Sequence, residues 1–254
     1  MILAIDIGNT SIALGGFEGD ELKFVGRLST DSTKTEDEYA SKIMNILTLH
    51  NVHKENVDGA IISSVVPALN SVMKSALRLV YDVDALMVCP GVKTGIGILC
   101  DSPSSVGADL ICSCVAANTF YSSPALIIDI GTATKMIATN KSGAFIGVSI
   151  IPGVMMGLKA LSSGTAQLPQ VSLEAPPTVI GKNTVDCMKS GIIFGHASMI
   201  DGMIDRINAE SGEKLPIIVT GGYASSIVPH CNHKMIYDEY LVLKGLNLIY
   251  NKNK

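Results

Sequence analysis

The stretches LAIDIGNT at residues 3–10 and LIIDIGTAT at residues 126–134 follow one plan: an apolar run, an aspartate and a glycine-containing turn. Each apolar run is typical of a buried strand. Asp6 and Asp129 lie 123 residues apart (129 − 6), close to half of the 254-residue chain. Repetition at that spacing predicts two copies of one lobe. The alternative is two unrelated strands that both end in Asp-Gly turns.

The segments around these stretches alternate between strand-like and helix-like patterns, which is typical of an α/β fold. We expect two duplicated lobes, one over residues 1–117 and one over residues 118–254, with a cleft between them. The strands are expected at 1–7, 11–17, 23–29, 58–66, 86–88, 124–129, 136–139, 145–151 and 215–220, and the helices at 35–49, 68–80, 108–119, 154–162, 185–195, 197–209 and 240–250.

The composition describes a folded protein with a large apolar core. Hydrophobic residues make up 47% of the chain and charged residues 17%, and the mean hydropathy is +0.38. The net charge is −4, whereas nucleic-acid binding requires clustered Lys and Arg residues. No apolar run reaches the roughly 18 residues of a membrane span. A small-molecule ligand is therefore expected, with no nucleic-acid or membrane partner.

The cysteine pattern favours a reducing compartment. Six cysteines are scattered through a chain that opens on a strand-like run, with no basic and then apolar leader. A cytoplasmic location is expected, with the cysteines as small buried hydrophobic residues.

Two groups of potential metal ligands are expected to have no metal role. The segment 230–233 contains two histidines and a cysteine but has no further ligand nearby in the sequence, so a surface loop is expected. Asp201 and Asp205, one helical turn apart, are expected on a solvated helix face.

An aspartate at a strand end, followed by glycine and by hydroxyl or amide side chains, suits a phosphate-binding turn. The glycine lets backbone approach a ligand, the N–H groups and hydroxyls donate to phosphate oxygens, and the carboxylate binds Mg²⁺ directly or through water. Two such turns predict a grip on ATP from both sides of the cleft. The candidate residues are Asp6, Gly8, Asn9 and Thr10 in the first turn and Asp129, Gly131 and Thr132 in the second, with Asp6 and Asp129 as metal or cation ligands.

A third glycine turn, Thr220, Gly221 and Gly222, follows another apolar strand. It predicts an adenosine-binding turn, and the alternative is a bend before the next helix. The chain has no P-loop and no Rossmann fingerprint, so neither of those nucleotide sites is expected.

Other motifs stand between these turns: DEY at 37–39, SSVVP at 63–67, TG at 94–95, Pro103, GAD at 107–109, IPG at 151–153, AQLP at 166–169 and GKNT at 181–184. With these and the three turns, DIGNT at 6–10, DIGTAT at 129–134 and TGG at 220–222, in order along its whole length, the chain resembles the type III pantothenate kinases. The resemblance implies ATP-dependent phosphorylation of pantothenate to 4′-phosphopantothenate, the first step of coenzyme A biosynthesis. It also implies two ribonuclease H-like (actin-like ATPase) lobes, a homodimer with active sites at the interface, Mg²⁺, and a monovalent cation, K⁺ or NH₄⁺.

The resemblance assigns roles to several residues. Asp109 matches the family's general base, which takes the proton of the pantothenate hydroxyl. Gly107, Ala108 and Thr184 match its substrate contacts. An alternative for Asp109 is an aspartate that stabilises a helix start and has no catalytic role.

The chain departs from the family pattern at three positions. Leu110 stands where the family has an arginine, and Lys135 and Ile137 replace a threonine and an aspartate after the second turn. One interpretation is a working kinase in which Lys135 contacts phosphate. The alternative is a nucleotide-binding or regulatory homologue without turnover, or a kinase for another small hydroxy acid.

Overall fold

The computed structural model describes residues 1–165 and 168–254, so two residues of the AQLP motif, Ala166 and Gln167, lie outside the described residues. The chain forms two compact units. One comprises Met1–Tyr121 and Tyr240–Lys254, and the other comprises Ser122–Glu239. We call them the first and the second unit and describe each by itself.

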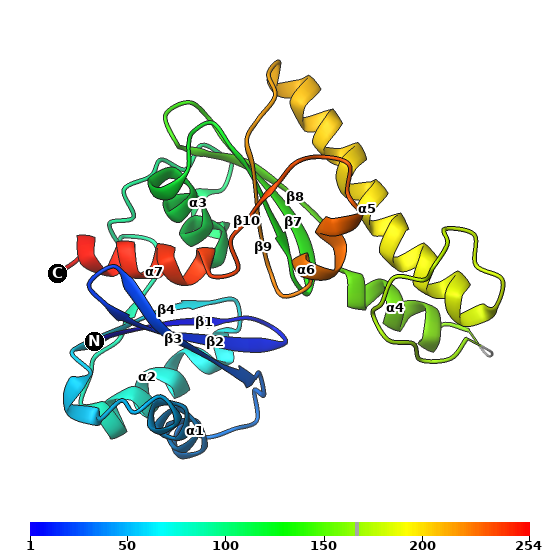
Figure 1. Ribbon diagram of the computed structural model, residues 1–254. Helices are drawn as coiled ribbons and strands as arrows, with labels where there is room; N and C mark the ends of the chain where they lie inside the picture. The colour runs from blue at the N-terminus through cyan, green and yellow to red at the C-terminus, as the bar shows by residue number, and fades with distance from the viewer. Residues whose placement is uncertain (166–167) are drawn as a thin grey trace. The chain divides into compact units, whose positions relative to one another are not determined.

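The first unit is a five-stranded sheet covered by helices on both faces. Figure 1 shows α1 and α2 on one face and α7 on the other. The strands are β1 (Ile2–Ile7), β2 (Ser11–Glu18), β3 (Glu21–Ser29), β4 (Gly59–Ser64) and β5 (Leu86–Met87), the helices are α1 (Glu36–Leu49), α2 (Asn70–Tyr81), α3 (Ala108–Phe120) and α7 (Leu241–Lys252), and the short 3-10 turns are η1 (Lys54–Asn56), η2 (Pro67–Leu69) and η3 (Pro103–Ser105).

Strand β1 has two buried faces, which explains its continuous apolar sequence. Leu3, Ile5 and Ile7 pack with residues of α1 and α2. Ile2 and Ala4 pack with residues of α3 and α7 on the opposite face. Because side chains alternate along a strand, Asp6 shares the face of Ile2 and Ala4. Its carboxylate therefore points to the side of the sheet that α3 covers.

The second unit repeats the same plan with its own helices. Leu126, Ile128 and Ile130 pack with α4, α5 and α6, which places Asp129 on the other face of the sheet. The strands are β6 (Leu126–Ile130), β7 (Ala133–Thr139), β8 (Phe145–Pro152), β9 (Ile217–Thr220) and β10 (Ile236–Tyr237), the helices are α4 (Val154–Ser163), α5 (Thr184–Ser211) and α6 (Ala224–Ile227), and η4 (Val228–His230) is a 3-10 turn.

The strand orders confirm the duplication. The first sheet runs β3-β2-β1-β4-β5 and the second runs β8-β7-β6-β9-β10. In each, the first three strands are antiparallel and the last two join in parallel. Strands β1 and β6, which carry the two aspartates, are therefore equivalent central strands.

The structure differs from the sequence-based expectation in the placement of the C-terminal helix. Residues 240–254 belong to the first unit, whereas the expected second lobe ran to residue 254. Helix α7 packs against α3, β1 and β4, and its Leu246 and Ile249 are fully buried there. Burial of this apolar face outweighs proximity in sequence.

Other expectations were wrong in detail. The two helices expected at 185–195 and 197–209 are one helix, α5. Asp201 is buried rather than solvated, and its carboxylate accepts hydrogen bonds from the backbone N–H groups of Asn232 and His233. Cys89 and Cys187 are exposed, whereas the cysteines were expected to be buried.

Among residues 1–165 and 168–254, no helix combines the length and apolar character needed to cross a membrane.

Candidate active site

The first turn, between β1 and β2, is closed by backbone hydrogen bonds. The Gly8 N–H donates to the Ser11 carbonyl at 3.0 Å. Thr30, just after β3, donates its hydroxyl to the Gly8 carbonyl at 2.6 Å and its N–H to the Thr10 carbonyl at 3.1 Å. The side chains of Asn9 and Thr10 are exposed, as donors to a ligand must be. Thr30 was not predicted as a site residue, because only the register of β3 brings it to this turn.

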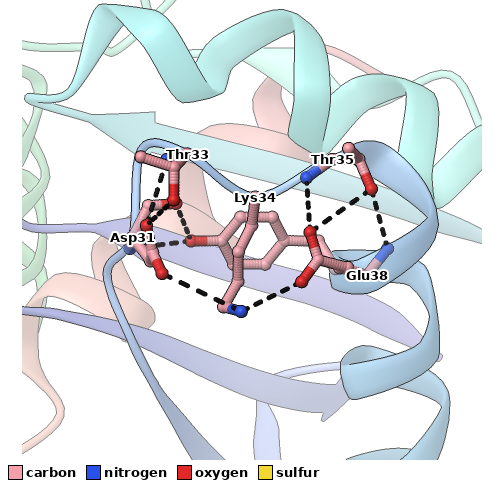
Figure 2. Close-up of polar contacts among 6 residues, drawn as sticks. Asp31, Thr33, Lys34, Thr35 and Glu38 are labelled. Carbon is pink, nitrogen blue, oxygen red and sulfur yellow. Dashed lines mark hydrogen bonds and ion pairs between the residues drawn. The ribbon is translucent and has the colours of Figure 1, made fainter.

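The segment that follows Thr30 is fixed by a polar network, which Figure 2 shows. The Asp31 carboxylate accepts from the N–H and hydroxyl of Thr33. The Lys34 ammonium lies 3.1 Å from a Glu38 carboxylate oxygen and 3.8 Å from one of Asp31. The Thr33 hydrogen bonds, and then the Lys34 charge, hold the pKa of Asp31 below its usual value. For Glu38, hydrogen bonds from the Thr35 N–H and then from Lys34 lower the pKa.

A capping box starts helix α1 beside this network. The Glu38 N–H donates to the Thr35 hydroxyl, and the Glu38 carboxylate accepts from the Thr35 N–H at 3.0 Å. Tyr39, fully buried, donates its hydroxyl to the Asp31 carbonyl. The DEY motif therefore supports the segment that braces the first turn.

Asp6, Asp109 and the buried thiol of Cys112 lie on the same side of the first sheet. Burial raises the pKa of the Cys112 thiol well above its usual value, and the negative charges of Asp6 and then Asp109 raise it further. Cys112 of α3 packs with Ile2 and Ala4 of β1, on the face that Asp6 shares, and Asp109 lies about one helical turn before Cys112. The structure thus places the candidate base and the first-turn aspartate, distant in sequence, on one face of the first sheet.

Asp109 is the second residue of α3 and is only 8% exposed. Its Oδ1 accepts the Leu110 N–H at 2.9 Å, and its carbonyl accepts the Ser113 hydroxyl at 2.9 Å. The N-terminus of a helix favours an ionised carboxylate. Leu110 is also buried, at 7% exposed, so its side chain belongs to the protein interior.

A buried oxygen beside Asp6 matches the donor chemistry that Mg²⁺ needs. Ser63 pairs with Asp6 in the parallel register of β1 and β4, so the two side chains share a face. The Ser63 hydroxyl is fully buried and has no hydrogen-bond partner among the described residues. A buried polar oxygen without a partner is costly, whereas a hydrated cation would satisfy it. Carboxylate and hydroxyl oxygens together suit a hard cation.

The second turn packs against two glycine segments of its own unit. The Gly131 N–H donates to the Ala133 carbonyl at 3.2 Å, and the Tyr223 N–H donates to the Ile130 carbonyl at 3.0 Å. Gly221 has a φ of +101°, and a Cβ there would lie 2.6 Å from Asp129 Oδ1 and from Ile130 backbone atoms. Gly153 likewise leaves no space for a Cβ beside the Thr132 carbonyl. Gly153 was missed as a site residue, although its Pro-Gly turn marks a close approach.

An ion pair occupies the strand end of the second turn. Asp129 and Lys135 are directly opposite each other in the antiparallel register of β6 and β7. The Lys135 Nζ lies 2.8 Å from Asp129 Oδ2, and the two side chains are 21% and 15% exposed. Lys135 is therefore not an outward-facing, solvated strand residue. Ile137 is fully buried.

The other predicted residues are spread over the second unit. Thr220 is 2% exposed and donates its hydroxyl to the Glu239 carbonyl at 3.3 Å, so its side chain lies in the interior. Gly222 and Thr184 are exposed, and Thr184 begins α5 behind the N-cap Asn183. Within the described residues, no hydrogen bond joins Thr184 to the second turn.

One histidine, His196, contacts the strand that follows the second turn. In the part of the chain that the structure describes, no three His, Cys, Asp or Glu side chains gather as metal ligands do. Thr134 Oγ1 lies 2.8 Å from Nε2 of His196, and burial lowers the pKa of that imidazole.

Comparisons with known proteins agree on one family. The family model described as type III pantothenate kinase matches residues 2–206. A type III pantothenate kinase of Exiguobacterium sp. is 42% identical over 254 residues, covering 100% of both chains. One of Moorella thermoacetica is 40% identical over 253 residues, again covering 100% of both chains.

Solved structures show the fold. The ethanolamine utilization protein EutJ of Carboxydothermus hydrogenoformans has a TM-score of 0.55 at 12% identity, covering 97% of this chain and 89% of its own. The ROK hexokinase of Thermus thermophilus has a TM-score of 0.52 at 10% identity, covering 100% and 99%. The expected duplicated ribonuclease H-like lobes of the actin-like ATPases are confirmed.

Proposed function

The chain belongs to the type III pantothenate kinase family, and on that basis we propose that it transfers the γ-phosphoryl group of ATP to the hydroxyl of pantothenate with Asp109 as general base. The product is 4′-phosphopantothenate, and the reaction opens coenzyme A biosynthesis. The observation that carries the assignment of Asp109 is its place in the first turn of α3, the helix that packs on the face of the first sheet to which Asp6 points. The candidate base and the candidate phosphate-binding turn thereby share one face of the first sheet.

Asp109 suits the task of a general base. A base must be ionised and within hydrogen-bond reach of the proton that it takes. Asp109 lies in the first turn of α3, where a negative charge is favoured, and its Oδ1 accepts the Leu110 N–H. We propose that its other oxygen accepts the proton of the pantothenate hydroxyl as the oxygen attacks the γ-phosphorus. Gly107, Ala108 and Thr184 remain the candidate substrate contacts that the resemblance implies.

The substrate nucleotide is MgATP, and each turn offers its own donors to it. We propose that Asp6 and the Ser63 hydroxyl bind the magnesium, directly or through water. Asn9 and Thr10 in the first turn and Gly131, Thr132 and Gly221 in the second are proposed to donate to the phosphates. Gly222 completes the proposed adenosine turn, whereas the interior Thr220 hydroxyl supports it only structurally. Positioning and charge stabilisation of this kind are most of what phosphoryl transfer requires.

The second candidate function is nucleotide binding without turnover, or phosphorylation of another small hydroxy acid. Leu110 favours it, because the arginine that the family presents to substrate is replaced by a buried apolar side chain.

The proposed function is tested by incubating the protein with MgATP and pantothenate and detecting 4′-phosphopantothenate by mass spectrometry. Reactions with pantoate or glycerate as acceptor are the comparison.

Product from pantothenate alone, with stoichiometric ADP, is the expected result. Product only from another acceptor would identify a different kinase. Binding of ATP in a thermal-shift titration without any phosphorylated product would establish the nucleotide-binding homologue.

A homodimer in the cytoplasm completes the proposal. The resemblance supports both the dimer and the location. Apolar side chains exposed on β8 and α4, such as Ile150 at 67% and Met156 at 48%, favour the dimer in addition. Light scattering across a concentration series would give the mass of a dimer if the proposal is right and of a monomer if it is wrong.

A further inference from the structure

The second turn carries its own positive charge. Lys135 reaches Asp129 from the directly opposite position of the neighbouring strand, and its ammonium lies at hydrogen-bond distance from Oδ2. The register of the hairpin fixes this pair, because opposite residues of an antiparallel ladder have neighbouring side chains on one face. The strand pairing therefore sets this contact, which differs from one between flexible side chains on the surface.

The first turn has no lysine at the equivalent position. There the residue opposite Asp6 is Ala13. The two hairpins otherwise share strand order and direction. The lysine is thus an addition to one of two equivalent aspartates and does not follow from the fold.

The resemblance implies a monovalent cation, and the sequence suggests Asp129 as a metal or cation ligand, but such a cation does not fit the residues present at Asp129. Oδ2 lies against the Lys135 ammonium at 2.8 Å. Oδ1 lies beside the backbone at Gly221 and Gly131, where a Cβ would be 2.6 Å and 3.3 Å away. A second positive charge on this carboxylate would lie within a few ångströms of the ammonium and be repelled in a partly buried setting.

We propose that the Lys135 ammonium takes the place of the monovalent cation at Asp129, so that catalysis needs neither K⁺ nor NH₄⁺. The inference rests on the proposed function, because Asp129 matters here as part of a phosphate-binding turn. An ammonium has the charge of K⁺, a similar size and three donors. Tethered to β7, it is present at the site at any salt concentration.

The test measures pantothenate phosphorylation in buffers free of K⁺ and NH₄⁺, with choline chloride replaced stepwise by KCl at constant ionic strength. The wild type is expected to turn over equally well throughout. Lys135→Thr, which removes the ammonium and opens space, is expected to lose roughly ten- to hundredfold in turnover without K⁺ and to regain it with K⁺. Lys141→Thr is the matched control, because Lys141 is 79% exposed and pairs with Glu213 instead. It should behave like the wild type.

A second readout does not depend on turnover. The thermal unfolding midpoint in the presence of MgATP is expected to be the same in KCl and choline chloride for the wild type, and to rise with KCl for Lys135→Thr, because a bound cation stabilises the folded state. A wild type that requires K⁺, or a Lys135→Thr variant that K⁺ neither rescues nor stabilises, would overturn the inference. Absence of phosphorylated pantothenate in every buffer would instead contradict the proposed function, and the unfolding midpoints would then decide the cation question alone.

Discussion

The turns after β1 and β6 are equivalent in topology but differ in what surrounds the aspartate. Asp6 lies opposite Ala13 and beside the buried Ser63 hydroxyl, on the face that also holds Asp109. Asp129 lies opposite Lys135 and against Gly221. The second turn is also one residue shorter, because Ile7 pairs with Ile12 whereas Ile130 pairs with Thr134. The two turns have the same place in the duplicated fold, and the different residues opposite each aspartate make them chemically unequal.

The largest expected effect is the loss of turnover when Asp109, on the same face of the first sheet as Asp6, is replaced. Asp109→Asn removes the proposed base, so kcat should fall by roughly 10²–10⁴-fold while the affinity for ATP is retained. Steady-state kinetics and a nucleotide titration measure the two quantities. Asp20→Asn, the same change at an exposed turn of the first unit, is the control and should leave kcat unaltered. An Asp109→Asn variant with near wild-type kcat would refute the assignment of the base.

The next effect distinguishes the two aspartates. Asp6→Asn weakens the proposed magnesium ligand, so the Mg²⁺ concentration for half-maximal turnover should rise by roughly ten- to hundredfold. Asp129→Asn should leave that concentration unchanged, because Lys135 rather than a metal faces its carboxylate. Turnover measured across a Mg²⁺ titration checks this. Equal shifts in both variants would mean that the turns are functionally alike.

A stability effect tests the packing of the second turn. Gly221→Ala forces a Cβ into Asp129 and Ile130 at a positive φ, which should lower the free energy of unfolding by about 2–4 kcal/mol. Gly222→Ala is the matched control, since a Cβ there meets nothing within 4 Å, and it should stay within about 0.5 kcal/mol of the wild type. Urea denaturation measures both. Similar losses in the two variants would argue against the close contact.

The smallest effect is a pH dependence confined to the second turn. Burial lowers the folded-state pKa of His196, which contacts Thr134. The residue of the first turn that corresponds to Thr134 is Ile12, whose side chain has no hydroxyl for such a contact. The unfolded chain therefore binds a proton at His196 more readily than the folded chain does. The stability that depends on a neutral His196 is fully present above the unfolded pKa near 6.5, and it is lost as the pH falls through the lower folded pKa. The His196→Gln variant should show a flatter decline in unfolding midpoint below that pH.

His53→Gln, at an exposed histidine, is the control for the pH series and should follow the wild type. The carboxylates Asp31 and Glu38, whose pKa values are lowered, destabilise the protein only at more acidic pH, when they become protonated. An unchanged slope in His196→Gln would show that the imidazole does not titrate with folding.

Local patterns were enough to predict the two turns, the strands that carry them and the duplicated fold. Asp6 and Asp129 stand at strand ends, and alternation along β1 and β6 then determines the face that each carboxylate occupies. Asp109 could be placed at a helix start for the same reason. These features depend on neighbours within a few residues.

Features that depend on pairing between distant segments could not be predicted. The Lys135–Asp129 contact needs the length of the second turn, which sets the register, and the position of Thr30 needs the register of β3. Helix α5 continues through Gly195, which lowers helix propensity, because buried residues such as Ile193, Ala197 and Ile200 hold both halves against the sheet. The placement of α7 in the first unit likewise follows from packing.

The inequality of the two turns is tested most directly by the rate at which the wild-type protein forms 4′-phosphopantothenate from MgATP and pantothenate in choline chloride, without K⁺ or NH₄⁺. We predict full turnover that added KCl does not increase, because Lys135 supplies the positive charge at Asp129. Turnover that appears only when KCl is added would contradict the account.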